Sequence, residues 1–315
     1  MRYVARLLPV GASIAPEERE RLLRRATSAS VAVAFVLGLS KLVAWWLSGS
    51  VAVLASLVDS ALDGSASLLN ALAVRYAMKP ADADHGFGHG KSEALAGMAQ
   101  ALLISVSGGF ILQHAIHRLD KPVPLQSTAI SASVMSLSLV ATIGLVSFQG
   151  FVVKKTGSTA VKADALHYMS DIASNIATIV AVLLAPLGWL RVDPIFGIII
   201  ALITLYSALK IGLETFDILM DRELPVEDTQ RIREIVLAHE HARGLHELRT
   251  RRAGPSTVIQ FHLELDGQMS VTESNRIAHE IVTRLSEEFP GADVLIHQDP
   301  AGGSVRPPPA PETLT

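Results

Sequence analysis

Two aspartates four residues apart lie inside a long apolar stretch of the chain. Asp59 and Asp63 belong to the segment SLVDSALDGSASLLNAL, whose other residues are mostly apolar or small. Residues four apart share one face of a helix, so both carboxylates would point into the same space. Each carboxylate at the centre of a bilayer costs roughly 2.5–3.5 kcal/mol, so such residues usually mark a function. A bound divalent cation would remove the repulsion between the two charges.

A second stretch, VKADALHYMSDIASNIA, repeats this spacing with His167 and Asp171. The helical rise places both pairs at a similar depth, so they can meet if the two helices pack together. Three carboxylates and one imidazole then form an oxygen and nitrogen ligand set that suits a tetrahedral Zn²⁺ ion. The alternative interpretation is a set of polar residues that hydrogen bond between packed helices. Asp164, which is nearer the inner surface, is expected at the rim of the site.

A glycine-rich polar segment, KPADADHGFGHGKSE, follows the first of these stretches. Asp82, His85 and His89 are spaced by three and four residues within it. Carboxylate and imidazole ligands at this spacing are compatible with a metal site. Solvated surface histidines are the alternative, because a glycine-rich loop need not hold them on one side.

Six of the eleven histidines lie in the C-terminal region. His246 begins the first strand expected there, His262 lies on the second, and His297 and Asp299 end the third. Strand residues distant in sequence can converge on one sheet, as a metal cluster requires. Two further histidines are expected at the surface, namely His239 and His241.

Most of the chain that must position these residues is apolar. The 315 residues are 50% hydrophobic and 18% charged, with a mean hydropathy of +0.38 and a net charge of −3. This balance gives no case for nucleic-acid binding. The absence of cysteine excludes disulfides and thiolate ligands. A bilayer span needs about 20 apolar residues, and six segments reach that length: 26–47, 51–77, 93–117, 128–153, 159–185 and 192–219.

The expected domains follow from these segments. Residues 1–25 form a cytoplasmic N-terminal extension, and residues 26–220 a transmembrane domain of six helices. Residues 221–300 show an α-β-β-α-β pattern that indicates a small cytoplasmic α+β domain of ferredoxin-like type. Residues 301–315 form a proline-rich tail that is expected to be disordered. Twelve basic residues flank the spans on one side and three on the other, so both termini are expected in the cytoplasm.

Several stretches between about Ser28 and Pro300 resemble the cation diffusion facilitator family: LVDSALDG, PADADHGFGHGKSEALA, LVSFQG, ADALHYMSD, LMDRELP, HELRTR and VLIHQDP. The resemblance implies six transmembrane helices and a cytoplasmic ferredoxin-like domain, assembled as a homodimer in a bacterial inner membrane. It implies export of Zn²⁺ from the cytoplasm in exchange for protons, with Cd²⁺ and Fe²⁺ as further candidate substrates. Zn²⁺ is then both transported and regulatory, and no organic cofactor is expected.

The resemblance also assigns roles to residues. It implies a transport site (Asp59, Asp63, His167, Asp171), a loop site (Asp82, His85, His89), a cytoplasmic two-zinc cluster (His246, His262, His297, Gln298, Asp299) and a salt bridge at the dimer's hinge (Lys91, Asp221). One ligand departs from the family pattern, because Asn275 stands where a histidine is expected. His279, one turn further along, is the candidate substitute.

Metal and protons are expected to compete for the transport site. Paired aspartates in a medium of low dielectric constant favour holding a proton, and histidine binds metal only when neutral. Two other classes of protein were considered. An intramembrane metalloprotease is excluded by the absence of an HExxH motif. A metal-sensing membrane scaffold would not need polar residues in the middle of the membrane.

Overall fold

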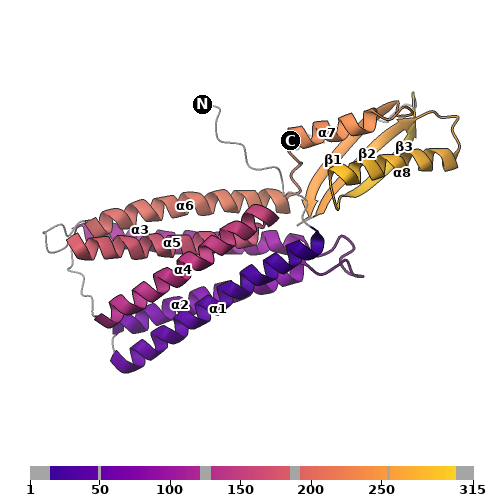
Figure 1. Ribbon diagram of the computed structural model, residues 1–315. Coiled ribbons are helices and arrows are strands. Elements are labelled where there is room, and N and C mark those ends of the chain that lie inside the picture. The colour runs from indigo at the N-terminus through magenta and orange to yellow at the C-terminus, as the bar shows by residue number, and fades with distance from the viewer. Residues whose placement is uncertain (1–14, 49–50, 121–128, 185–191, 254–255, 303–315) are drawn as a thin grey trace. The chain divides into compact units, whose positions relative to one another are not determined.

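The computed structural model describes residues 15–48, 51–120, 129–184, 192–253 and 256–302. The chain divides into two compact units, Met1–Met220 and Asp221–Thr315. Six long helices of the first unit run alongside one another (Figure 1). They are α1 (Pro16–Ser48), α2 (Val51–Ala77), α3 (Lys91–Asp120), α4 (Ala129–Thr156), α5 (Thr159–Leu184) and α6 (Val192–Leu219).

The first helix begins ten residues before the segment that hydropathy alone selects. Pro16 occupies the first turn of α1, followed by Glu17 and Glu18. Proline suits the first helical position and acidic side chains suit the positive end of the helix dipole, which explains the early start. The added turns pack inside the unit, since Leu23 is fully buried in a cluster with Val74. Part of the expected N-terminal extension is therefore the beginning of α1.

Four of the six long helices are apolar enough over their described residues to cross a membrane. These spans are Glu17–Leu47, Lys91–Leu119, Ser136–Thr156 and Pro194–Leu219, in α1, α3, α4 and α6. The other two helices, α2 and α5, are 27 and 26 residues long and carry the expected metal ligands.

Small residues let α3 and α6 approach closely along their length. A Cβ atom added at Gly97 of α3 would lie 2.9 Å from Cγ2 of Thr215 in α6. At the other end of the pair, a Cβ atom at Gly197 of α6 would lie 3.1 Å from Cβ of Ala115 in α3. Close backbone approach through small residues is the usual way in which helices pack where water supplies no driving force.

The second unit has the expected order of elements: α7 (Val226–Leu237), β1 (Gly244–Ala253), β2 (Ser256–Leu265), α8 (Val271–Glu288) and β3 (Asp293–Pro300). The sheet order is β1-β2-β3, with β1 antiparallel and β3 parallel to β2. The parallel pair requires a crossover connection, which α8 supplies. Ser270 caps the N-terminus of α8. Its hydroxyl accepts a hydrogen bond from the backbone N–H of Glu273, 3.2 Å away.

One face of this sheet packs against α7 and α8. Alternate residues of β2, among them Phe261 and Leu263, are fully buried in one core with Ile277 and Ile281 of α8 and Ile232 of α7. Because successive side chains of a strand point to opposite faces, the residues between them lie on the face away from the helices. His262 lies on that second face.

Candidate metal sites

Helices α2 and α5 bring three of the four expected transport-site residues together. Nε2 of His167 lies 2.9 Å from Oδ1 of Asp63 and 3.9 Å from Oδ2 of Asp171. One potential ligand atom from each residue lies within 4.8 Å of the others. The fourth residue, Asp59, lies on α2 one turn before Asp63, and its side chain is outside the described residues. Two carboxylates and an imidazole from separate helices therefore face one another.

This geometry is compatible with a bound dication, and it also contains one hydrogen bond between His167 and Asp63. Oxygen and nitrogen ligands lie about 2.0–2.2 Å from Zn²⁺, so neighbouring ligand atoms in a tetrahedral site are about 3.3–3.6 Å apart. The two distances at Nε2 bracket that range. All three side chains are partly accessible, with 16% to 41% of their surface exposed. Solvent or an ion can therefore reach them.

Asp164 was expected at the rim of this site, and that expectation is wrong. Its residue surface is only 1% exposed. Its carboxylate accepts hydrogen bonds from Ser30, Ser67 and Gln149, which lie on α1, α2 and α4. Distance from the helix end predicts depth along the helix but not which neighbours surround it. The glutamine in the apolar run LVSFQGFVV was the signal in the sequence that a buried polar partner existed.

The loop after α2 gathers Asp82, His85 and His89, with one potential ligand atom each within 4.8 Å of the others. Nδ1 of His89 lies 3.2 Å from the carbonyl oxygen of Pro80, which only accepts, so this nitrogen carries the proton. Nε2 of the same ring is buried and lies 3.2 Å from Oδ2 of Asp82 without forming a hydrogen bond. A ring whose Nδ1–H is held by a backbone carbonyl, with Nε2 left without a hydrogen bond, is the arrangement that a metal-ligating histidine shows.

The carboxylate of this loop group remains ionised over a wider pH range than an ordinary aspartate. The backbone N–H of His85 donates to Oδ1 of Asp82 at 2.8 Å and holds the pKa of that carboxyl below its usual value. Hydrogen bonds to the charged form favour it. The loop site therefore presents a charged ligand whether or not an ion is bound.

The second unit places three histidines in a row across its sheet. His246 pairs with His262 in the β1–β2 register, and His262 pairs with His297 in the β2–β3 register. Neighbouring ring centroids are 5.1 and 4.5 Å apart. Asp299, two residues after His297, contacts all three rings, at 3.3 Å from Nε2 of His246, 2.9 Å from Nδ1 of His262 and 3.2 Å from Nε2 of His297.

Some ligand atoms of this cluster have few hydrogen-bond partners that would compete with a metal ion. Both ring nitrogens of His246 are buried and form no hydrogen bond. Buried polar atoms without partners are uncommon and need an explanation such as an ion that binds there. The hydrogen bond with His262 holds the pKa of Asp299 below its ordinary value, so the bridging carboxylate is charged. Two imidazoles and this carboxylate fit a divalent metal ion.

Two residues expected in this cluster lie elsewhere. Gln298 pairs in register with Leu263, which belongs to the core on the helix-covered face, so Gln298 lies on the face opposite the histidine row. His279 is exposed on α8, one of the helices that cover that same face. Neither residue belongs to the group of close ligand atoms that His246, His262 and Asp299 form.

Two glutamates that were not selected from the sequence approach the row instead. Oε1 of Glu264 lies 3.6 Å from Nε2 of His246, and Oε2 of Glu247 lies 3.9 Å from Nε2 of His262. Glu247 follows His246 at an irregularity in the β1–β2 register and has a positive φ of 49°. A bulge of this kind redirects a side chain, so a strict alternation of faces does not predict its position.

His239 was expected at the surface, and this is also wrong. The residue is 4% exposed, and its Nε2 lies 3.0 Å from Oε2 of Glu280 on α8. The hydrogen bond from His239 keeps the pKa of Glu280 below its usual value. His241 remains partly exposed, with 39% of its side chain accessible. The pair joins the segment after α7 to α8, with the histidine buried and Glu280 partly exposed.

The expected salt bridge between Lys91 and Asp221 would join the two units, and it stays a prediction. Within the first unit, Nζ of Lys91 donates to the carbonyl oxygen of Leu219 at 3.5 Å. Within the second unit, Oδ1 of Asp221 accepts from Nη1 of Arg251 at 3.2 Å.

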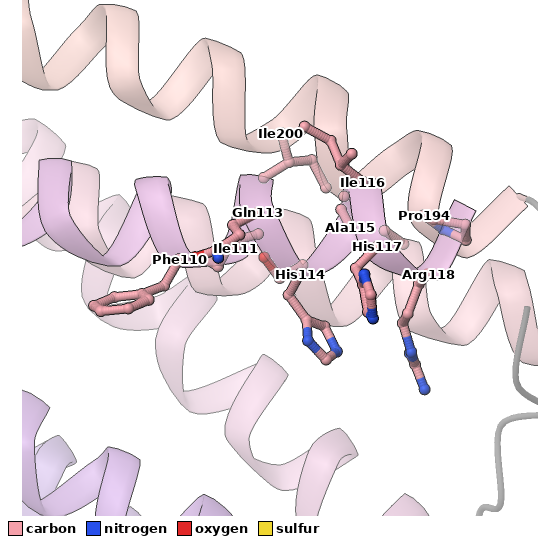
Figure 2. A pocket seen from close by; sticks show the side chains of 13 residues that line it. Phe110, Ile111, Gln113, His114, Ala115, Ile116, His117, Arg118, Pro194 and Ile200 are labelled. Atoms are coloured by element: carbon pink, nitrogen blue, oxygen red, sulfur yellow. The ribbon is translucent and has the colours of Figure 1, made fainter. Parts of the chain in front are cut away.

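A cavity of about 920 Å³ lies between α3, α5 and α6. It is lined by Phe110, Ile111, His114, His117 and Arg118 of α3, and further by Ser174 of α5 and Pro194 and Ile200 of α6. Figure 2 shows the side chains of His114, His117 and Arg118 pointing to the same side of α3. Ser174 follows Asp171 by one helical turn, so the cavity extends along α5 beyond the group of Asp63, His167 and Asp171.

The chain was compared with known proteins. Its residues 28–220 match the family described as the cation efflux transmembrane domain, and residues 224–301 match the cation efflux protein, cytoplasmic domain. The cation-efflux pump FieF of Klebsiella pneumoniae is 47% identical over 281 residues, which cover 89% of this chain and 94% of that protein. FieF of Salmonella arizonae is 45% identical over 280 residues, which cover 89% and 93%.

A solved structure of CzrB, described as a candidate zinc transporter, in its zinc form is 38% identical. The match covers 27% of this chain and 99% of that chain, with a TM-score of 0.25. Both halves of this chain match family models, and relatives of nearly equal length share almost half of their residues with it. The chain therefore belongs to the cation efflux family, also called the cation diffusion facilitators, whose members are metal transporters.

Proposed function

We propose that this protein exports a divalent metal cation from the cytoplasm in exchange for protons. Alternating access would take place at the membrane group, which consists of Asp63, His167 and Asp171. The observation that carries the proposal is the convergence of these ligands from α2 and α5, two helices far apart in sequence. All six long helices would cross the membrane, with Asp59 as the fourth ligand. The relatives named cation-efflux pumps support the direction of transport.

The exchange of metal for protons follows from the ligand types. An imidazole between two carboxylates holds a proton well, because both neighbours stabilise its charged form. A divalent cation binds only after the imidazole has lost that proton. The two states are therefore mutually exclusive at one place. A protein that opens this place to one side of the membrane with metal, and to the other with protons, couples the two flows.

The cavity beyond Asp171 supports a release path. Its lining includes Ser174, one turn further along α5, together with residues of α3 and α6. The distribution of basic residues puts this end of the helices outside the cytoplasm. An ion that leaves the membrane group along α5 would pass into this cavity.

We assign Zn²⁺ as the principal substrate, with Cd²⁺ and Fe²⁺ as further candidates. Imidazole ligands suit zinc and iron, whereas sites made of carboxylate and carbonyl oxygens suit manganese and magnesium. The single histidine in the membrane group thus biases selection toward the softer ions. The loop group and the histidine row would hold regulatory Zn²⁺, which in the cytoplasmic unit would favour a homodimer.

The proposal is tested with Asp63→Ala in proteoliposomes that contain a pH-sensitive dye. We expect zinc-driven proton movement to be abolished, because the paired ligand on α2 is lost. The control is Ser65→Ala, whose exposed hydroxyl bonds only to Ala61 of its own helix and which we expect to transport normally. Transport by Asp63→Ala at the unmodified rate would refute the site and the mechanism together.

A further inference from the structure

Asp164 joins four helices although it is not one of the expected metal ligands. It lies on α5, and Oδ2 of its carboxylate accepts a hydrogen bond from Nε2 of Gln149 at 2.6 Å and another from the hydroxyl of Ser30. Oδ1 accepts from the hydroxyl of Ser67 at 3.2 Å. In the ranges that the structure describes, every hydrogen-bond partner of this carboxylate is neutral. A buried acidic group in a membrane domain with only neutral partners is costly and usually has a function.

A chain of hydrogen bonds leads from Asp164 toward the metal group. Ser67 has one hydroxyl proton and gives it to the carboxylate, so its oxygen is free to accept. The hydroxyl of Tyr168 lies 3.0 Å from that oxygen and is therefore the donor. Tyr168 is 2% exposed, and its ring packs edge to face against the ring of His167, with centroids 5.5 Å apart.

The hydrogen bond between Ser67 and Asp164 lies beside the metal ligands of both α2 and α5. Ser67 follows Asp63 by one turn of α2, and Asp164 precedes His167 by one turn of α5. The contact between Ser67 and Asp164 therefore fixes the approach of the two helices immediately beside the place where their ligands meet. Gln149 and Ser30 attach α4 and α1 to the same point, where Gln149 and Asp164 are 0% and 1% exposed.

We propose that Asp164 is a positioning residue for the membrane metal group: as a hydrogen-bond acceptor it holds Ser67, and through Ser67 the hydroxyl of Tyr168, so that the ring of Tyr168 fixes the orientation of His167. The inference rests on the proposed function of that group. It assigns to Asp164 a role as acceptor rather than as a carrier of charge. Outer partners that orient a ligating histidine typically change metal affinity by about 10- to 100-fold when they are removed.

The acceptor role can be separated from the charge by two substitutions at one position. Asp164→Ala removes both oxygens, and we expect the affinity of the membrane group for Zn²⁺ to fall by about tenfold or more. Asp164→Asn keeps an oxygen for Ser67, while its amide can pair with Gln149 after rotation of that side chain, whose Oε1 has no partner. We therefore expect Asp164→Asn to bind Zn²⁺ nearly as well as the unmodified protein.

Tyr168→Phe supplies a test that does not depend on a buried cavity. The substitution keeps the ring and removes only the hydroxyl, so the protein should fold even if Asp164→Ala does not. We expect weaker Zn²⁺ binding with a raised apparent KM for transport and little change in the maximal rate. Because both residues act through Ser67, the losses in Asp164→Ala and Tyr168→Phe should not multiply in the double variant.

The measurement is a Zn²⁺ titration of the full chain in detergent against a fluorescent chelator. The same titration of Asp63→Ala is subtracted, so that only the membrane group is reported, and Ser65→Ala serves as the control that leaves affinity unchanged. Equal impairment of Asp164→Asn and Asp164→Ala would overturn the inference, as would full affinity in Tyr168→Phe. If instead the unmodified protein and Asp63→Ala titrate identically, the proposed transport site itself is wrong.

Discussion

At the scale of single residues, metal binding depends on which histidine nitrogen carries the lone pair. In the loop group, Nδ1 of His89 donates a hydrogen bond to the carbonyl oxygen of Pro80, which leaves Nε2 without a hydrogen bond, 3.2 Å from Oδ2 of Asp82. In the membrane group, Nε2 of His167 faces both carboxylates. Backbone contacts and packing thus hold one nitrogen of each ring beside the other candidate ligands before any ion arrives, which lowers the entropy cost of binding.

The ligand type of residue 167 should control metal preference. His167→Asp replaces the only nitrogen ligand of the membrane group with an oxygen, and oxygen ligands favour harder cations. We expect Mn²⁺ to become a better competitor of Zn²⁺ by about tenfold, measured as inhibition of zinc flux into proteoliposomes. Unchanged competition between the two metals would contradict the argument from ligand softness.

The spacing of ligands was predictable from the sequence, whereas burial was not. Four-residue spacing placed Asp63 with its neighbours on one face, because helical periodicity is a local property. Asp164 and His239 were misplaced because their burial depends on helices that are distant in sequence. Glu247 could not be selected, since its position follows from a bulge that breaks the alternation of the strand.

At the scale of elements, the tight pairing of α3 and α6 constrains how the first unit can rearrange. Small residues face larger ones at both ends of the pair, where Gly97 lies against Thr215 and Gly197 against Ala115. Close-packed surfaces of this kind do not slide without loss of contact. Movements that open the membrane group are therefore expected between this pair and the remaining helices.

Gly97→Val should loosen that pair. A Cβ atom at this position would lie 2.9 Å from Cγ2 of Thr215 and 3.4 Å from the backbone of Thr159, so a branched side chain has no room. Overpacking of this kind typically costs about 1–3 kcal/mol. We expect a lower thermal unfolding midpoint in detergent. The midpoint is measured by tryptophan fluorescence or by light scattering.

The comparison variant for this experiment is Gly109→Val. Gly109 lies on the same helix, and a Cβ atom there would meet nothing within 4 Å. An unfolding midpoint that falls equally in both variants would show that helix propensity, rather than the contact with α6, causes the effect.

Most elements could be predicted because their patterns are local. The order α-β-β-α-β of the second unit appears in the sequence as alternating and helical periodicities, and the structure confirms the α+β domain. The start of α1 was predicted ten residues late, because hydropathy marks the apolar part of a helix rather than its first turn at Pro16.

At the scale of the whole molecule, each of the two units carries its own candidate metal groups. The first unit holds the membrane and loop groups and the second holds the histidine row, each with a core of its own. Matches to two family models divide at the same part of the chain. Binding at one unit can therefore be changed by substitution without removal of the ligands in the other.

The absence of cysteine from the sequence allows a direct test of orientation. Glu240→Cys, in the exposed segment after α7, should react with an impermeant maleimide only in inside-out vesicles or after permeabilisation. Ser127→Cys, between α3 and α4, should react from outside in intact cells. These outcomes follow from the excess of basic residues on one side of the spans. Reaction of both positions from the same side would contradict the orientation, and the unmodified protein provides the unlabelled control.

The last strand of the sheet has a consequence for solubility. Among the described strands, β3 pairs with β2 alone, so one row of its backbone groups is open to strand addition by another molecule. The residues that β3 contributes to this cluster, His297 and Asp299, would be fixed in register by a bound ion. We therefore expect chelation of metal to leave this edge freer to recruit foreign strands, so that aggregation during purification would begin at the C-terminal strand.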